Sequence, residues 1–194
     1  MTISISVSSL LEAYRQGIFP MAMSDGEIRW FSPDPRGILP LEEFHLPRRL
    51  ARVVCQRRFK VRINCDFDRV IQLCADSKDT WIDDVILESY KALHQSGFAH
   101  SVETWQDNRL VGGLYGVSLG GVFFGESMFY RVRDASKVAL HALVTRLSSR
   151  GYGLLDVQWV TPHLRGFGAC EVPRKEYLQL LENNIKRDCR FVEL

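Results

Sequence analysis

The stretch "LVGGLYGVSLGGVFFGESMF", residues 110–129, decides the expected fold. Two runs rich in β-branched and aromatic residues flank Gly120–Gly121, which is the pattern of a β-hairpin. We predict strands over residues 109–117 and 122–129, joined by a turn at these glycines. The second strand carries a single charge, Glu126. This carboxylate either lies in solvent at a strand end or points into a cavity that needs it.

The periodicity of apolar residues predicts further helices and strands on both sides of this hairpin. These elements fit one mixed central sheet, so the fold class is α/β (or α+β). The order hairpin, helix, strand, helix, strand also matches the second half of a GNAT-like acyltransferase fold. The predicted elements are helix 8–17, a helix that Asp66 caps, helix 83–96, strand 99–105, the hairpin, a helix from Ala135 or Ser136 to Gly151, strand 154–160, a last helix 173–186 with Pro173 at its first position, and strand 190–194.

The segment at residues 18–40 holds four of the seven prolines. Proline density excludes a helix there, while its aromatic residues argue against a loose linker. We therefore predict a small N-terminal unit ending in a folded lip, residues 1–38, followed by one main domain, residues 39–194. No secretory signal and no apolar run of about 18 residues is expected, which predicts a cytoplasmic protein.

The cysteines and histidines number five each and are scattered along the chain, with no C-x-x-C pair. Such a set is typical of reduced thiols in the cytoplasm, and it gives no spacing suited to zinc ligands. We predict no metal site.

The segment at residues 48–62, "RRLARVVCQRRFKVR", is strongly basic and contains no acid. A solvated face and a surface that binds a polyanion are both consistent with such a run. A nucleic acid backbone would be the natural polyanion, and such contacts would carry no sequence information. Five apolar residues within the segment, Leu50, Val53, Val54, Phe59 and Val61, should anchor it to the core. Its seven cations are Arg48, Arg49, Arg52, Arg57, Arg58, Lys60 and Arg62.

Asp156 and Gln158 interrupt the apolar strand "LLDVQWV", two positions apart and therefore on one face. That face is either wet, or it joins Glu126 in a polar pocket on the inner strands. Unpaired buried charge is costly, so a buried cluster of this kind favours a site for general-base work or cation recognition. A negative pocket beside a positive surface suggests one polyanionic and one cationic substrate.

Common nucleotide-binding motifs are absent from the sequence. The P-loop pattern does not occur, and "GVSLGG" is a turn. The pyrophosphate loop [QR]-x-x-G-x-[GA] of CoA-dependent acetyltransferases is not matched at "HLRGFGA", where Ala169 and Cys170 follow Gly168.

Eight blocks of the chain together resemble the leucyl/phenylalanyl-tRNA–protein transferase family. The resemblance extends from about Leu11 to Leu181. It implies that residues 1–38 form a small N-terminal domain and that residues 39–194 form a GNAT-like catalytic domain. It implies transfer of Leu or Phe from aminoacyl-tRNA to the α-amino group of proteins that begin with Lys or Arg, which creates an N-degron, without metal or CoA. The blocks are "AYRQGIFP", "WFSPDPRGIL", "TWI", "AHSVETW", "LVGGLYGVSLGGVFFGESMF", "DASKVAL", "LLDVQ" and "HLRGFGACEVPRKEYL".

The resemblance also implies roles for individual residues. Asp156 would orient or deprotonate the attacking amine, directly or through Gln158, and Glu126 would hold the N-terminal Lys or Arg or its ammonium group. Trp81 would line the nucleotide and aminoacyl site, where stacking contributes about 1–3 kcal/mol. The seven cations of residues 48–62 would contact the tRNA backbone. A pocket for the Leu or Phe side chain would draw on Met128, Phe129 and Leu143.

Two departures from the family pattern concern the N-terminal part. The family usually reads G-I-F-P-W, whereas Met21 stands here in place of the tryptophan, so adenosine stacking should be weaker or come from Trp30 or Phe31. The N-terminal domain is also shorter than in many relatives. Donor choice stays open among Leu, Phe and Met, and we expect a monomer. The alternatives are a CoA-dependent N-acyltransferase and a non-catalytic tRNA-binding protein.

Overall fold

The computed structural model describes residues 4–77 and 80–193. Most predicted elements are present, including the hairpin with its turn at Gly120–Gly121 and the cap at Asp66, whose side chain accepts from the Arg69 N–H. The helices are α1 (Val7–Arg15), α2 (Arg48–Cys55), α3 (Phe67–Ala75), α4 (Asp84–Gln95), α5 (Ala135–Ser149), α6 (Pro162–Arg165) and α7 (Arg174–Ile185). The strands are β1 (Phe19–Ala22), β2 (Ile28–Phe31), β3 (Arg36–Ile38), β4 (Lys60–Ile63), β5 (Ala99–Gln106), β6 (Arg109–Leu119), β7 (Val122–Tyr130), β8 (Leu154–Gln158) and β9 (Cys170–Val172).

A mixed seven-stranded sheet with the order β4-β5-β6-β7-β8-β3-β9 forms the centre of the fold. Only β7 and β8 pair in parallel, and every other pair in this sheet is antiparallel. A parallel neighbour requires a crossover, and α5 supplies it. Strands β1 and β2 form a separate hairpin.

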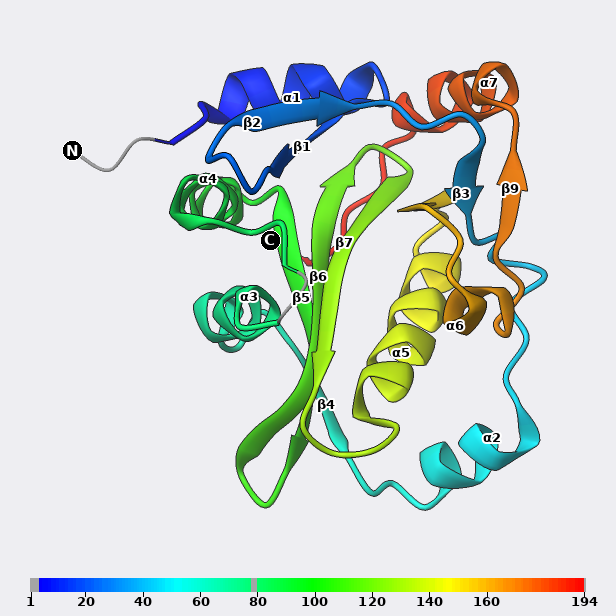
Figure 1. The fold of residues 1–194 in the computed structure, drawn as a ribbon. Helices are drawn as coiled ribbons and strands as arrows, with labels where there is room; N and C mark the ends of the chain where they lie inside the picture. The colour runs from blue at the N-terminus through cyan, green and yellow to red at the C-terminus, as the bar shows by residue number, and fades with distance from the viewer. Residues whose placement is uncertain (1–3, 78–79, 194) are drawn as a thin grey trace.

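Helices cover both faces of the sheet and produce two apolar cores (Figure 1). Side chains of α1, α3, α4 and α7 fill the core on one face, where Leu10, Tyr90 and Tyr177 are fully buried. The other core lies under α5 and α2, with Leu143 and Leu147 at its centre. A sheet buried on both faces gives nearly continuous apolar strands, which explains why a charge stands out in this hairpin.

Three sequence predictions about local structure are wrong. No strand forms among the described residues after α7, because residues 188–193 lie against α5 as irregular chain, with Phe191 buried there. Pro173 precedes α7 as its N-cap residue and is not its first helical residue. Strand β8 ends at Gln158, whose φ of +64° turns the chain out of the extended conformation.

The lip at residues 18–40 is folded as expected, and its last part joins the central sheet. Strand β3 is inserted between β8 and β9, with Gly37 opposite both Gln158 and Glu171. Gly37 has no room for a side chain, since a Cβ there would come within 2.9 Å of the Trp159 backbone. The division into domains at residues 38 and 39 stays a prediction.

Candidate active site

A β-bulge places Glu126 at the point where the two parallel strands stop pairing. Along β6 and β7, Gly116 pairs with Gly125 and Tyr115 pairs with Ser127, so Glu126 is the extra residue. Bulges redirect a side chain and interrupt the ladder locally. The last pair between β7 and β8 is Phe124 with Asp156, directly before this bulge. Pairing between β7 and β8 therefore ends beside Glu126 and Asp156.

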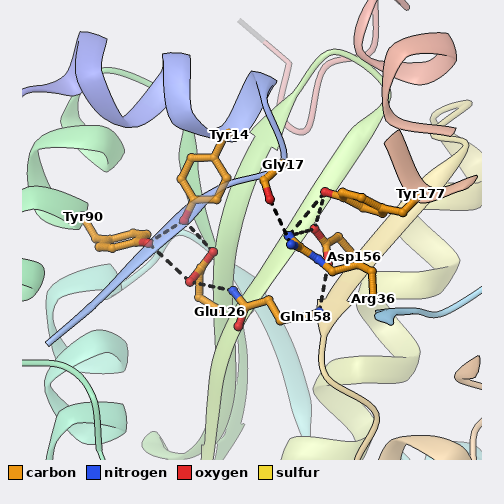
Figure 2. Close-up of polar contacts among 8 residues, drawn as sticks. All are labelled: Tyr14, Gly17, Arg36, Tyr90, Glu126, Asp156, Gln158 and Tyr177. Atoms are coloured by element: carbon orange, nitrogen blue, oxygen red, sulfur yellow. Dashed lines mark hydrogen bonds and ion pairs between the residues drawn. The ribbon is translucent and has the colours of Figure 1, made fainter. Parts of the chain in front are cut away.

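Glu126 is buried among hydrogen-bond donors from three other elements (Figure 2). Its Oε1 accepts from the Tyr14 hydroxyl at 2.6 Å, and its Oε2 accepts from Tyr90 at 3.3 Å and from Gln158 Nε2 at 3.1 Å. Burial raises the pKa of this carboxyl to about 7, while these hydrogen bonds act in the opposite direction and Asp156 adds a further rise. Glu126 therefore changes charge near neutral pH.

Asp156 is fully buried and is paired with a buried arginine that the sequence analysis did not nominate. Arg36 donates to both carboxylate oxygens, from Nε at 3.0 Å and from an Nη at 2.6 Å, and Tyr177 donates at 2.7 Å. The other Nη donates to the Gly17 carbonyl at 2.9 Å. Burial lowers the pKa of Arg36, but Asp156 more than offsets this and the pKa lies above its ordinary value. The bidentate pair is fixed in one geometry.

Gln158 connects the two carboxylates. Its backbone N–H donates to Asp156 Oδ1 at 2.8 Å, while its side-chain amide donates to Glu126. The bond to Asp156 stabilises the left-handed backbone of Gln158, a conformation that costs a non-glycine residue free energy. All three predicted polar residues are thus buried together, and the alternatives of a wet face and a solvated Glu126 are wrong.

A cavity of about 360 Å³ opens beside this cluster. Glu126, Gln158, Ser127, Thr161 and His163 contribute polar side chains to its wall, and most of the other lining residues are apolar. Asp156 does not line it and reaches it only through Gln158. The apolar lining comes from the hairpin, α5 and β8, and includes Leu114, Met128, Leu140, Leu143, Leu155 and Val157.

The three residues predicted for the side-chain pocket divide between the two faces of the sheet. Met128 and Leu143 both line the cavity. Phe129 does not, because neighbouring residues of a strand point to opposite faces, and it packs in the core with α3 and α4. This corrects its predicted place.

The residues predicted for adenosine lie around the β1–β2 hairpin, outside the cavity lining. Trp81 is half-buried, and its carbonyl accepts from the N–H of Ala22, next to Met21. Trp30 is exposed on β2. Phe31 is half-buried and its ring packs edge-on against Trp159, which does line the cavity.

The basic segment forms α2 and β4 at one end of the sheet. Six of its seven cations are exposed, and Arg62 is half-buried with its guanidinium 4.9 Å from the ring centre of Trp105. Within the described part of the chain, none of the seven forms an ion pair. Leu50, Val53 and Phe59 are buried anchors and Val54 packs beside them, whereas Val61 is exposed on the edge strand.

Sequence reasoning missed five residues that complete the site: Arg36, Tyr14, Tyr90, Tyr177 and Trp159. The buried tyrosines lie in helical apolar patterns, which predict core packing and give no sign of a hydroxyl contact. Trp159 follows Gln158 directly, so its place after the two polar residues of an otherwise apolar strand was the one usable signal.

Neither a metal site nor a membrane span was expected. In residues 4–77 and 80–193, no three or more His, Cys, Asp and Glu side chains group as metal ligands would. No helix of the same residues is long and apolar enough to cross a membrane.

Comparisons with known proteins agree with the fold and identify the family. The family model described as "Leucyl/phenylalanyl-tRNA protein transferase" matches residues 38–182, and that of its N-terminal domain matches residues 4–34. The proteins of that name from Gloeobacter violaceus and Rhodopseudomonas palustris are 50% and 54% identical to the chain, each over 98% of it, and it covers 100% and 87% of them.

A solved structure titled "Crystal structure of FemX" has a TM-score of 0.55 at 11% identity, covering 92% of this chain and 73% of FemX. This likeness shows the GNAT-like fold that was predicted. The sequence matches go further, and the chain belongs to the leucyl/phenylalanyl-tRNA–protein transferase family.

Proposed function

We propose that this protein transfers Leu or Phe from aminoacyl-tRNA to the α-amino group of proteins that begin with Lys or Arg. The observation that carries the proposal is the cavity, whose wall is mainly apolar and includes the carboxylate of Glu126 beside the amide of Gln158. An apolar slot suits an uncharged side chain such as Leu, Phe or Met, and it discriminates only modestly between substrates that differ by a methylene. Among the described residues, Glu126 is the one acid that lines it, and this supports a cationic acceptor.

In the proposed reaction, the amine nitrogen attacks the ester carbonyl carbon, and the bond to the ribose oxygen breaks. The proton lost by the amine ends on that oxygen, which leaves deacylated tRNA and a new peptide bond. An aminoacyl ester is already activated, so positioning and one proton transfer are the main tasks. Ionised Glu126 holds the acceptor's ammonium group or its side-chain cation. Gln158 contacts the amine, and Asp156 acts through Gln158 as a positioning residue.

The donor's terminal adenosine would lie beside Trp81 and the β1–β2 hairpin, with Phe31 or Trp30 supporting Met21 there. The exposed cations of α2 and β4 would contact the tRNA backbone, and that binding should weaken steeply as salt increases. The product would carry a destabilising N-terminal residue, and the enzyme would act as a cytoplasmic monomer.

The deciding experiment mixes labelled Leu-tRNA or Phe-tRNA with peptides that begin with Arg, Lys, Asp or Ala. Label should appear on the Arg and Lys peptides alone. Label on every peptide would contradict the acceptor assignment, and label on none would leave a tRNA-binding protein without this activity. Size-exclusion chromatography tests the monomer, and calorimetric titration with acetyl-CoA should give no binding.

A further inference from the structure

A second hollow opens directly beside the reaction cavity, and nothing above assigns it. Its volume is about 530 Å³, and it shares Met128 and His163 with the cavity. It lies where β7 ends and α5 begins. The other residues that line it are Tyr130, Arg133, Asp134, Ser136 and Lys137.

The groove carries two cations and one acid. Lys137 Nζ lies 3.3 Å from Asp134 Oδ1, and Arg133 Nε lies 4.0 Å from Asp134 Oδ2. Asp134 is nearly buried, whereas the Arg133 side chain is 74% exposed. Asp134 lies within ion-pair distance of both cations, and the three groups together carry one net positive charge. Burial and the nearby Lys137 lower the pKa of His163, so this imidazole is neutral at pH 7 and adds hydrogen-bonding capacity without charge.

Tyr130 gives the same groove an exposed aromatic face. It is 68% exposed, the largest exposure among the large apolar side chains that are exposed in the described chain. Cations combined with an exposed ring are what single-stranded nucleic acid requires, because phosphates contact the cations while a base stacks on the ring.

Helix α5 also lines a smaller hollow beside the basic segment. Val138 follows Lys137 on α5 and lines a smaller hollow that Arg57 and Arg58 border. Cations therefore border two hollows along α5, one near the loop after α2 and one beside the reaction cavity. Once the aminoacyl group occupies the cavity, the RNA that carries it must leave along the surface, and these two hollows offer cations to its phosphates.

We propose that Arg133, Lys137 and Tyr130 bind the unpaired nucleotides that precede the aminoacylated one at the 3′ end of the donor. Arg133 and Lys137 contact their phosphates, and Tyr130 stacks on a base. This inference rests on the proposed function and extends it from the terminal nucleoside to the single strand behind it. Arg57 and Arg58 would then contact the acceptor stem further along.

Three donors of increasing length test the proposal: phenylalanyl-adenosine, which has no phosphate, phenylalanyl-CCA, and Phe-tRNA. The double variant Arg133→Ala/Lys137→Ala should raise the KM for the two longer donors about tenfold, and leave the KM for the adenosine ester within about twofold. Tyr130→Ala should follow the same pattern. The pair Arg57→Ala/Arg58→Ala should affect Phe-tRNA alone. Lys186→Ala, an exposed lysine elsewhere, is the matched control.

The variant Asp134→Asn tests the groove in the opposite direction, because it removes a negative charge where the Arg133/Lys137 variant removes two positive ones. Asparagine accepts the left-handed backbone of this position, φ +69°, so the loop should keep its shape while the groove gains one net positive charge. Binding of a labelled CCA trinucleotide, measured by fluorescence anisotropy, should tighten about threefold for Asp134→Asn and should weaken for the Arg133/Lys137 pair. When both cations are removed, the plot of the logarithm of the binding constant against the logarithm of the salt concentration should become less steep by about 1.4.

Equal losses with all three donors, or unchanged values with all three, would overturn the proposal. A rise in the KM of the acceptor peptide alone would assign the groove to the acceptor protein instead. If the wild-type protein transfers from no donor, the proposed function fails. Anisotropy with the trinucleotide still reports on the groove in that case.

Discussion

Tyr14 on α1 donates a hydrogen bond of 2.6 Å to Glu126 on β7, 112 positions along the chain. Helix α1 thereby influences the charge of Glu126, the carboxylate that lines the cavity. Burial raises the pKa of Glu126, and the Tyr14 bond is the strongest influence that lowers it. The N-terminal part of the chain therefore contributes a hydrogen bond to the charged residue of the site.

Replacing this tyrosine should shift the pH dependence of transfer. In Tyr14→Phe, Glu126 loses a donor that favours its ionised form, so the inflection of kcat/KM near pH 7 should move about half a unit or more upwards. Tyr115→Phe is the matched control, because the Tyr115 hydroxyl has no hydrogen-bond partner in the described structure. Identical pH profiles for the two variants would show that the Tyr14 bond has no influence on activity.

Glu126→Gln should change both activity and the pH dependence of stability. The folded pKa of about 7 lies above the ordinary value of 4.5, so the folded state favours the protonated carboxyl. Its contribution to the free energy of unfolding is fully present below pH 4.5 and is lost as the pH rises through 7. The total loss is on the order of 3 kcal/mol.

Glutamine cannot ionise, so urea unfolding of Glu126→Gln should lack this decline between pH 5 and pH 8. Transfer to an Arg peptide should fall at least tenfold at pH 8, where the wild-type carboxylate is charged. If the free energy of unfolding depends on pH in the same way for the variant and the wild type, the pKa of Glu126 is not raised in the folded state.

Asp156→Ala should separate catalysis from binding. The change leaves Arg36 buried without its partner and removes the acceptor that holds the Gln158 backbone. A displacement of about 1 Å at a reacting group can cost about a hundredfold in rate, so single-turnover transfer should fall by that factor or more. Binding of a non-hydrolysable Phe-tRNA analogue should stay within about threefold.

Breaking one side of a buried ion pair typically costs about 3–5 kcal/mol, so these assays need a folded protein, checked by circular dichroism. Arg36→Lys is the companion variant, since it keeps the charge and loses the bidentate geometry. If donor binding falls as far as the rate does, Asp156 supports the binding surface and does not act through Gln158.

Val157→Phe should change the choice of donor. Val157 lines the cavity and is only half-buried, so a larger ring can enter the cavity without opening the core. The smaller cavity should disfavour the Phe side chain more than the Leu side chain. The ratio of kcat/KM for Leu-tRNA to that for Phe-tRNA should therefore rise about tenfold. Competition between the two labelled donors measures this ratio directly. An unchanged ratio would place the transferred side chain elsewhere.

Long amphipathic elements were predictable from the sequence, whereas short ones that depend on distant partners were not. Helix α5 and the hairpin each carry enough periodic apolar residues to identify themselves. Strand β3 has three residues, one of them charged, and it exists only because β8 and β9 lie on either side. Helix α2 has its apolar residues at helical spacing, but its arginines dominate the sequence signal.

The same contrast applies to the candidate site. Glu126, Asp156 and Gln158 break apolar strands, so each is visible locally. Arg36 is not, because an arginine in a proline-rich segment normally lies in solvent, and its partner is 120 positions away. A periodic pattern also cannot show that a tyrosine hydroxyl points at a carboxylate. Only the folded arrangement supplies that information.

The position of β3 has a consequence for the order in which the protein becomes active during synthesis. Residues 36–38 leave the ribosome early, yet both strands that flank them, β8 and β9, end only at residues 158 and 172. The ion pair between Arg36 and Asp156 can therefore form only after most of the polypeptide has been synthesised. An unfinished chain has no assembled candidate site, so we expect that a truncated translation product that lacks the last strands does not attach amino acids to other proteins.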